Sequence, residues 1–296
     1  MTQTPDIICI GSVLWDIIGR CDDAMAIGND KPGHITRIPG GVALNIAMML
    51  NRFGRTPTLL SVVGDDPAGR ELLLRCDQMG LDTSAMLVAS DLRTDVYMAI
   101  EAQGNLVAAI ADAHSLEAAG NTILTPLENG TLGSAQAPWG GTIVLDGNLT
   151  TEVLTEISAS DAFSAADLRI APASPGKAIR LRPLLAHPRA TLYVNREEAG
   201  LLTGTYPANA AAAAEALLAE GARRVLVTEG AQMAVDASAD GTLSEVPPGV
   251  QARRITGAGD TFMAAHIAAE LDGMARADAL TRAVTAAATY VSGETP

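Results

Sequence analysis

The sequence predicts an α/β fold built around a mainly parallel central sheet. Short apolar runs alternate with amphipathic helical patterns along most of the 296 residues, which is typical of strands joined by crossover helices. Glycine or proline stands at most of the expected boundaries between elements. Because 48% of the residues are hydrophobic, a large core can form, and we expect one domain spanning residues 1–296.

Four elements are expected in the first eighty residues. The apolar run at 6–11 is typical of a buried strand, and the helix expected over 40–54 starts with two glycines and ends on a third. A second strand is expected at 58–64. The helical pattern at 66–80 carries proline in its first turn, where the missing amide donor has no helical acceptor to lose.

Two segments interrupt this alternation. Residues 17–38 are polar and rich in turn formers, and residues 94–113 have the pattern of a hairpin around Gln103-Gly104. We expect the two segments to form a small sheet that projects from the main domain as a lid. The alternative is that they are ordinary edge strands.

The second half of the chain returns to alternation. Strands are expected at 142–147, 191–195 and 223–230, and the alanine-rich stretch 208–221 is typical of a helix packed closely on a sheet. The final amphipathic run follows the tetrapeptide Gly-Ala-Gly-Asp at 257–260.

Composition excludes several classes of partner. The formal net charge of −14 disfavours nucleic-acid binding, which needs clustered Lys and Arg, and no apolar run reaches the roughly 18 residues of a membrane span. The first residues lack the basic region of a signal peptide. Cys9, Cys21 and Cys76 are scattered without a C-x-x-C pair, so we expect reduced thiols and a cytoplasmic protein.

The tetrapeptide at 257–260 carries the clearest chemical signal. Glycines ahead of a helix leave backbone N–H groups free, and the helix dipole adds positive potential. Gly257, Ala258 and Gly259 therefore form a candidate anion site. A carboxylate beside such a site is explained if it accepts a proton from a group that attacks the anion, so Asp260 is the candidate general base.

Asp16 and Asn45 form a candidate site for vicinal hydroxyls. Asp16 follows the first strand, at the edge where open α/β sheets bind ligands, and Asn45 lies one turn into the helix opened by Gly40 and Gly41. A carboxylate accepts hydrogen bonds from hydroxyls, while an amide both donates and accepts. The alternative is that each is a turn or capping residue.

Polar residues also end the later strands. Asn195 ends one strand and precedes Glu197 and Glu198, either of which could hold a hydrated Mg²⁺ beside a phosphate. The alternative is that both are acids favoured by the dipole in a first helical turn. Thr228 and Gly230 end the next strand and are candidate neighbours of a nucleotide phosphate.

These motifs resemble those of the ribokinase-like carbohydrate and nucleoside kinases, also called the phosphofructokinase-B family, over nearly the whole chain. The family's signature Asp-Thr-Thr/Ser-Gly-Ala-Gly-Asp-Thr/Ser-Phe is matched over residues 256–262. The signature Gly-Gly-x-x-x-Asn-x-Ala is matched by Gly40, Gly41, Asn45 and Ala47.

The resemblance implies a ribokinase-like three-layer sandwich with a projecting β lid, ATP and Mg²⁺ as cofactors, and a small nucleoside or sugar as substrate. The family's Asn-x-x-Glu magnesium motif is matched by Asn195 and Glu198, which favours Glu198 over Glu197 as the metal residue. The backbone at 257–259 would hold the γ-phosphoryl group, and Asp260 would accept the proton of a primary hydroxyl. A homodimer formed through the lid is a further expectation.

Two departures from the family pattern stand out. Many members carry Asp before the Thr-Thr pair, where it is implicated in binding a monovalent cation, whereas this chain has Arg254 and Ile255 there. The loop after Thr228 has Gln232 in place of the usual second glycine. We therefore expect little response to potassium.

Within the family, residues 94–113, residues 144–150 and the Ile-Thr pair before Gly-Ala-Gly-Asp resemble the pseudouridine kinases in particular. Tyr97 and Asp112, in the lid, become candidate substrate contacts, with exposed hairpin residues as the alternative. The expected reaction is ATP-dependent phosphorylation of the ribose 5′-hydroxyl of pseudouridine. The alternatives are a ribokinase, a fructokinase, an adenosine-type kinase, or a nucleoside-binding sensor without catalysis.

Overall fold

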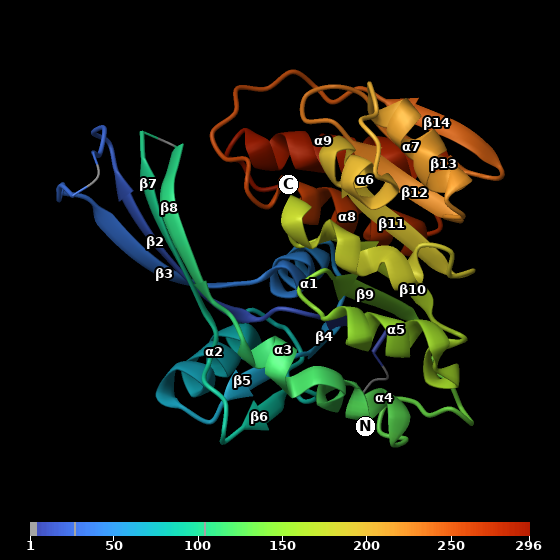
Figure 1. Ribbon diagram of the computed structural model, residues 1–296, viewed down its shortest axis with the longest axis horizontal. Coiled ribbons are helices and arrows are strands. Elements are labelled where there is room, and N and C mark those ends of the chain that lie inside the picture. The colour runs from blue at the N-terminus through green and yellow to red at the C-terminus, as the bar shows by residue number, and fades with distance from the viewer. Residues whose placement is uncertain (1–4, 27, 104) are drawn as a thin grey trace.

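The computed structural model describes residues 5–26, 28–103 and 105–296. Eight strands form its main sheet, most of which are labelled in Figure 1. Their bounds are β1 (Ile7–Ile10), β4 (Pro57–Leu60), β9 (Thr142–Asp146), β10 (Asp167–Ala171), β11 (Ala190–Asn195), β12 (Arg224–Thr228), β13 (Ala234–Ser238) and β14 (Gly241–Glu245). The order across the sheet is β14-β13-β12-β11-β10-β9-β1-β4. The strands from β12 to β4 run parallel, and β13 and β14 continue the sheet in antiparallel fashion. The predicted mainly parallel sheet is confirmed.

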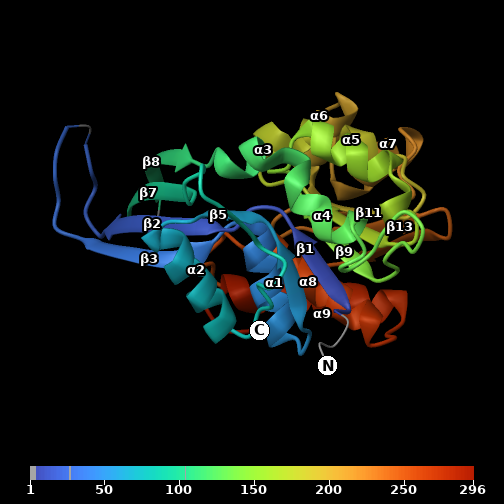
Figure 2. The ribbon, with the colours of Figure 1, turned by 90° about the horizontal axis from the view of Figure 1, so that it is seen from below.

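Helices cover both faces of this sheet, which gives three layers (Figure 2). One face carries α1 (Val42–Arg52), α2 (Pro67–Gln78), α8 (Ala258–Leu271) and α9 (Arg276–Val291). The other carries α3 (Ser115–Ala119), η1 (Gly120–Leu124), α4 (Thr125–Glu128), α5 (Thr151–Ala159), η2 (Asp161–Phe163), η3 (Pro175–Leu184), α6 (Arg196–Thr203) and α7 (Ala210–Ala219). Alternate residues of β1 point into the two resulting cores, with Ile8 and Ile10 in one and Ile7 and Cys9 in the other. None of the described helices is long and apolar enough to cross a membrane.

Helix starts follow the sequence signals. The Asp66 carboxylate caps α2 by accepting from the Gly69 amide, with Pro67 in the first turn. Asn209 caps α7 in the same way through the Ala212 amide. The alanines on the inner side of α7 are buried, and the helix lies against β12 and β13, so the predicted close packing is confirmed.

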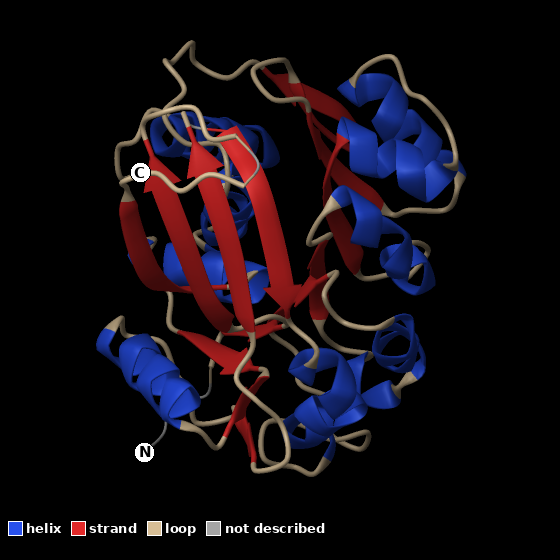
Figure 3. Cartoon of the chain, turned by 60° about the vertical axis from the view of Figure 1, so that its left-hand side comes forward, coloured by secondary structure: helices blue, strands red, loops and turns tan. Residues whose placement is uncertain are grey.

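Four strands form a second sheet that projects from the main body (Figures 1 and 3). They are β2 (Leu14–Cys21), β3 (His34–Gly40), β7 (Val96–Ala102) and β8 (Asn105–Asp112), in the order β3-β2-β7-β8. These strands overlap the two segments that interrupt the alternation, although β2 starts before residue 17 and β3 ends after residue 38. The predicted projecting sheet is therefore confirmed, with wider bounds in its first segment. In the hairpin turn, Gln103 adopts a positive φ of 51°, and Gly104 lies outside the described residues.

The prediction of a single strand over 58–64 is wrong. The main-sheet strand β4 ends at Leu60, and β5 (Val62–Gly64) pairs instead with β6 (Leu87–Ala89) in a separate small sheet. The chain changes sheets at Ser61, whose carbonyl accepts a 2.9 Å hydrogen bond from the Leu87 amide. Residues on both sides of the break are buried, so the apolar pattern runs through it without interruption.

Candidate active site

Asp260 and Asn45 meet where helices α8 and α1 begin. The Asn45 side-chain amide donates a 3.1 Å hydrogen bond to the Asp260 carboxylate. Each residue lies in the first turn of its helix, and the two helices pack against each other along their lengths. Gly41, which precedes α1, has a φ of 103° and lies so close to the Ser12 carbonyl that a Cβ would collide with it. The two predicted functional helix starts are therefore brought together.

The environment of Asp260 raises its pKa to about 7. Burial of the carboxylate is the main cause, and the negative charges of Asp146 and Glu198 act in the same direction. The hydrogen bond from Asn45 opposes them by stabilising the ionised form. A carboxylate with a pKa near neutrality is suited to accept a proton at physiological pH.

The turn before α8 presents donors to the same place. Gly257 has a φ of 90°, a left-handed conformation that glycine adopts without strain, and it leads directly into the helix. The Ala258 amide donates to the Ile255 carbonyl at 3.1 Å. In the described part of the chain, the amides of Gly257 and Gly259 have no protein acceptor, so these two donors are available to an anion.

Asp16 lies on β2 against Gly40, whose missing side chain leaves room for the Asp16 carboxylate. Burial raises the pKa of Asp16 to about 6. No donor from the described residues reaches this carboxylate, which leaves both oxygens able to accept from a ligand. Gly40 ends β3 immediately before the turn into α1, so Asp16 and Asn45 flank one short stretch of backbone.

The lid brings one of its two candidate residues to Asp16. Tyr97 on β7 is the direct partner of Asp16 across the parallel pair, so both side chains lie on one face of the lid. Burial is the main cause of the raised pKa of Tyr97, and the charge of Asp16 adds to it. Asp112 pairs instead with Val96, which puts it on the opposite face, and it is exposed. The structure therefore does not bring Asp112 to Asp16.

The candidate nucleotide residues occupy the ends of two adjacent strands. Asn195 ends β11 and pairs with Thr228, which ends β12. Gly230 follows in an exposed turn with a φ of 58°. Asn195 also caps α6, because its side chain accepts from the Glu198 amide at 2.9 Å while Glu198 accepts from the Asn195 amide at 2.8 Å.

Glu198 is the better placed of the two acids considered for magnesium. Its side chain is buried, whereas Glu197 is exposed. Burial raises the pKa of Glu198 to about 7, and its charge in turn acts on Asp260, so the two carboxylates share one electrostatic environment. A cation between them would relieve this repulsion.

The donor set fits Mg²⁺ but does not form a complete cage. In the described residues, no group of three or more His, Cys, Asp or Glu side chains could hold a metal ion. Mg²⁺ keeps several waters and is commonly bound by one or two carboxylates together with substrate phosphates. Glu198, with one oxygen held by the Asn195 amide and the other free of a protein partner among the described residues, matches that requirement.

Sequence reasoning missed Asp146, which forms hydrogen bonds to several backbone segments next to the site. This fully buried residue ends β9, and its Oδ2 accepts from the Ser12 amide and hydroxyl, both at 2.8 Å, and from the Ala43 amide at 3.0 Å. Its Oδ1 accepts from the Asn148 amide at 2.8 Å. Asp146 thus joins the end of β1 to the start of α1. The available signal was an Asp at the end of the apolar run Ile143–Leu145.

A buried polar network missed by sequence reasoning holds α8 on the sheet. The His266 ring shares a 2.8 Å hydrogen bond with the Tyr193 hydroxyl, and Arg169 donates to that hydroxyl at 2.9 Å. Arg169 and Arg224 both bind Glu270, one turn beyond His266. Tyr193 lies on β11 two residues before Asn195, so this network ties the helix of Asp260 to the strand of the nucleotide site.

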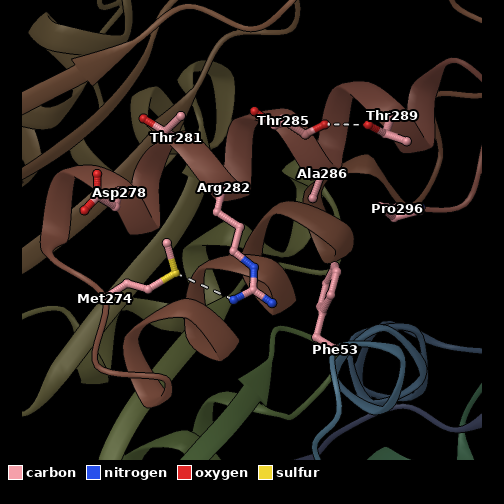
Figure 4. A pocket seen from close by; sticks show the side chains of 9 residues that line it. All are labelled: Phe53, Met274, Asp278, Thr281, Arg282, Thr285, Ala286, Thr289 and Pro296. Carbon is pink, nitrogen blue, oxygen red and sulfur yellow. Dashed lines mark hydrogen bonds between the residues drawn. The ribbon is translucent and has the colours of Figure 1, made fainter.

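A separate hollow of about 510 Å³ lies along α9, beside the end of α1 (Figure 4). Its walls include Phe53, Met274 and Arg282, with the Arg282 guanidinium over the Phe53 ring at 5.5 Å. None of the predicted site residues lines it. The functional candidates therefore gather at the sheet edge and not in this hollow.

Known carbohydrate and nucleoside kinases are similar to this chain. The family model "pfkB family carbohydrate kinase" matches residues 4–295. A pseudouridine kinase of Escherichia coli is 27% identical over 285 residues, covering 95% of this chain and 88% of the relative. An uncharacterized sugar kinase of the same organism, YeiI, is 30% identical over 307 residues, covering 97% and 78%. A ribokinase of Arabidopsis thaliana, solved with ribose and ATP, superposes with a TM-score of 0.77 at 18% identity, covering 98% and 93%.

The family match spans almost the whole chain, and the superposition confirms the predicted ribokinase-like fold. The chain belongs to the pfkB family of carbohydrate kinases.

Proposed function

We propose that this kinase uses ATP and Mg²⁺ to phosphorylate the ribose 5′-hydroxyl of pseudouridine. The observation that carries the proposal is the meeting of Asn45 and Asp260 beside the free amides of Gly257 and Gly259. An acceptor for a proton and donors for an anion then lie side by side, as transfer of a phosphoryl group to an alcohol requires.

In the proposed mechanism, Asp260 accepts the proton of the 5′-hydroxyl as the hydroxyl oxygen attacks the γ-phosphorus, with ADP as the leaving group. Asn45 holds the Asp260 carboxylate in place. The amides of Gly257 and Gly259 stabilise the negative charge of the group in transfer, with Ala258 shaping the turn between them. When bound, ATP supplies the phosphoryl group and Mg²⁺ neutralises phosphate charge.

The nucleotide is proposed to lie over the ends of β11 and β12. Asn195, Thr228 and Gly230 border this position, and Glu198 would hold the hydrated Mg²⁺. The burial of Glu198 and its influence on the pKa of Asp260 support its place beside the reacting groups.

The ribose is proposed to bind between the lid and α1. Asp16 and Asn45 would bind the 2′- and 3′-hydroxyls, with Gly40 and Gly41 allowing close approach of the sugar. Tyr97, beside Asp16 on the same face of the lid, would contact the uracil ring, whose N1–H is free in pseudouridine. The likeness to a pseudouridine kinase over 95% of the chain supports this substrate.

A sugar is the second candidate substrate. The likeness to the sugar kinase YeiI is higher in identity, at 30%, and Asp16 and Asn45 would bind the hydroxyls of a free pentose equally well. Discrimination between the two candidates falls to the lid, because only a nucleoside places a base against Tyr97.

A homodimer through the lid is part of the proposal. Ile35, Met98, Ile100 and Ile110 share one face of the lid sheet and are all exposed, Ile110 by 69% and Ile35 by 79%. A second copy would cover this apolar face. Light scattering after gel filtration should give twice the chain mass for the wild type and the chain mass for Ile110→Lys.

The cytoplasm is the proposed location, because the three cysteines are buried free thiols, as expected in a reducing compartment.

An ADP-release assay across a substrate panel tests the proposed reaction. We expect kcat/KM to be highest for pseudouridine and lower for uridine, adenosine, ribose and fructose. Equal or better use of ribose or fructose would exclude a nucleoside as the preferred substrate, while the assignment of kinase activity would remain. No ADP release above the substrate-free rate with any acceptor would favour a non-catalytic sensor.

A further inference from the structure

The segment that leads into the Gly257 turn is hydrogen-bonded to the C-terminal part of the chain. The amides of Arg253 and Arg254 both donate to the Val291 carbonyl, at 2.9 and 3.3 Å. Val291 is the last residue of α9, so the approach to the candidate anion site rests on the C-terminal end of that helix.

The Arg254 side chain provides the strongest part of this attachment. Its Nε donates to the Tyr290 carbonyl and its Nη2 to the Glu294 carbonyl, both at 2.7 Å. The guanidinium also stacks over the Tyr290 ring, 3.6 Å from the centroid. Carbonyls at a helix C-terminus carry partial negative charge, which a permanently charged guanidinium complements.

Tyr290 passes this attachment on to the anion turn. Its hydroxyl donates to the Thr256 carbonyl at 3.1 Å. The same hydroxyl lies against Gly257, where a Cβ would collide with it. Arg254 holds Tyr290, and Tyr290 holds the two residues that set the direction of the Gly257 and Gly259 amides.

We propose that Arg254 is a positioning residue, a covalently tethered cation that fixes the 257–259 turn through Tyr290. This inference rests on the proposed phosphoryl transfer, for which the turn supplies the anion site. A tethered cation remains at its site at any ionic composition, whereas an exchangeable ion must be bound from solution. The anion site is then assembled before any substrate arrives.

The test compares Arg254→Ala and Tyr290→Phe with Arg282→Ala. Arg282 is a matched control, because its guanidinium also lies over an aromatic ring, but it pairs with Asp272 and lines the hollow of Figure 4 instead of contacting the turn. Tyr290→Phe keeps the ring under Arg254 and removes only the hydrogen bond to Thr256. The measurements are kcat, KM and amide hydrogen exchange of residues 255–261 without ligands.

We expect Arg254→Ala to lower kcat roughly ten- to a hundredfold, because displaced anion-site donors lose their geometry. KM for the alcohol should change less than about threefold, since Asp16 and Asn45 are untouched. Exchange at residues 255–261 should become faster, and Tyr290→Phe should show a smaller change of the same kind. Arg282→Ala should match the wild type in kcat and exchange.

Chemical rescue separates positioning from general loss of stability. Guanidinium at millimolar concentration should restore part of the kcat of Arg254→Ala and slow the exchange again, while urea, its neutral analogue, should do neither. An Arg254→Ala enzyme with wild-type kcat and exchange, or equal effects of guanidinium and urea, would overturn the inference. A wild type that transfers no phosphoryl group overturns the proposed function instead, and the exchange measurement then still decides whether Arg254 orders the turn.

Discussion

The Asn45 side chain donates a 3.1 Å hydrogen bond to Asp260 across 215 residues of sequence. The bond joins the first turns of α1 and α8, and through them the sugar side of the site to the anion turn. It also opposes the burial that raises the pKa of Asp260. This contact therefore holds the proposed base in position and favours its ionised form.

The dependence of kcat on pH should report this balance. Because the pKa of Asp260 is raised to about 7 and the ionised form is the base, kcat at saturating substrates should rise as pH increases through about 7. Asn45→Leu removes the contact that lowers this pKa, so the kcat of this variant should rise at higher pH than the kcat of the wild type. Rate profiles of the two enzymes between about pH 5.5 and 9.5 make the comparison. Superimposable profiles would contradict the assignment.

Magnesium dependence should respond to Glu198 and not to its neighbour. Glu198→Gln removes the charge of the buried carboxylate, so the Mg²⁺ concentration for half-maximal activity should rise roughly tenfold or more. Glu197→Gln is the matched control, because Glu197 is exposed in the same turn, and its titration should follow the wild type. A larger effect in the Glu197 variant would assign Mg²⁺ binding to Glu197 instead of Glu198.

Potassium should have little effect on the wild-type enzyme. Arg254 places a fixed positive charge against the carbonyls of Tyr290 and Glu294, and this charge repels a second cation. Activity in buffers with equal concentrations of sodium or potassium chloride should differ less than about twofold. A many-fold rise in potassium would show that a cation site exists despite the guanidinium.

Nucleoside discrimination should depend on the face of the lid that carries Asp16. Tyr97→Phe removes a hydroxyl beside the proposed position of the uracil ring, so the ratio of kcat/KM for pseudouridine over uridine should fall roughly tenfold. Asp112→Asn changes the opposite face and should leave this ratio within about twofold. The reverse order of effects would mean that the substrate contacts the other face.

Local sequence signals predicted most of the helices near the site and their polar ends. Gly41 before α1, Asn195 and Glu198 at the start of α6, and Gly257 before α8 each act within one turn of their own helix. The spacing of glycine and polar residues is enough to reveal such features.

Features set by distant contacts could not be predicted in this way. Asp146 bonds to Ser12, 134 residues away, and the apolar strand before it gives no hint of that partner. The break at Ser61 lies between two equally buried strands. The face on which Asp112 lies depends on strand register, where a shift of one residue reverses every side chain.

The turnover number of Asp260→Asn, measured by ADP release with pseudouridine, tests the central claim most directly. Asparagine keeps the size of the side chain and the possibility of a hydrogen bond with Asn45 but cannot act as the base. With an unchanged melting temperature and unchanged ATP binding, kcat should fall by about 10²–10⁴. A variant that folds, binds ATP and retains kcat within a few-fold of the wild type would contradict the assignment of Asp260 as the general base.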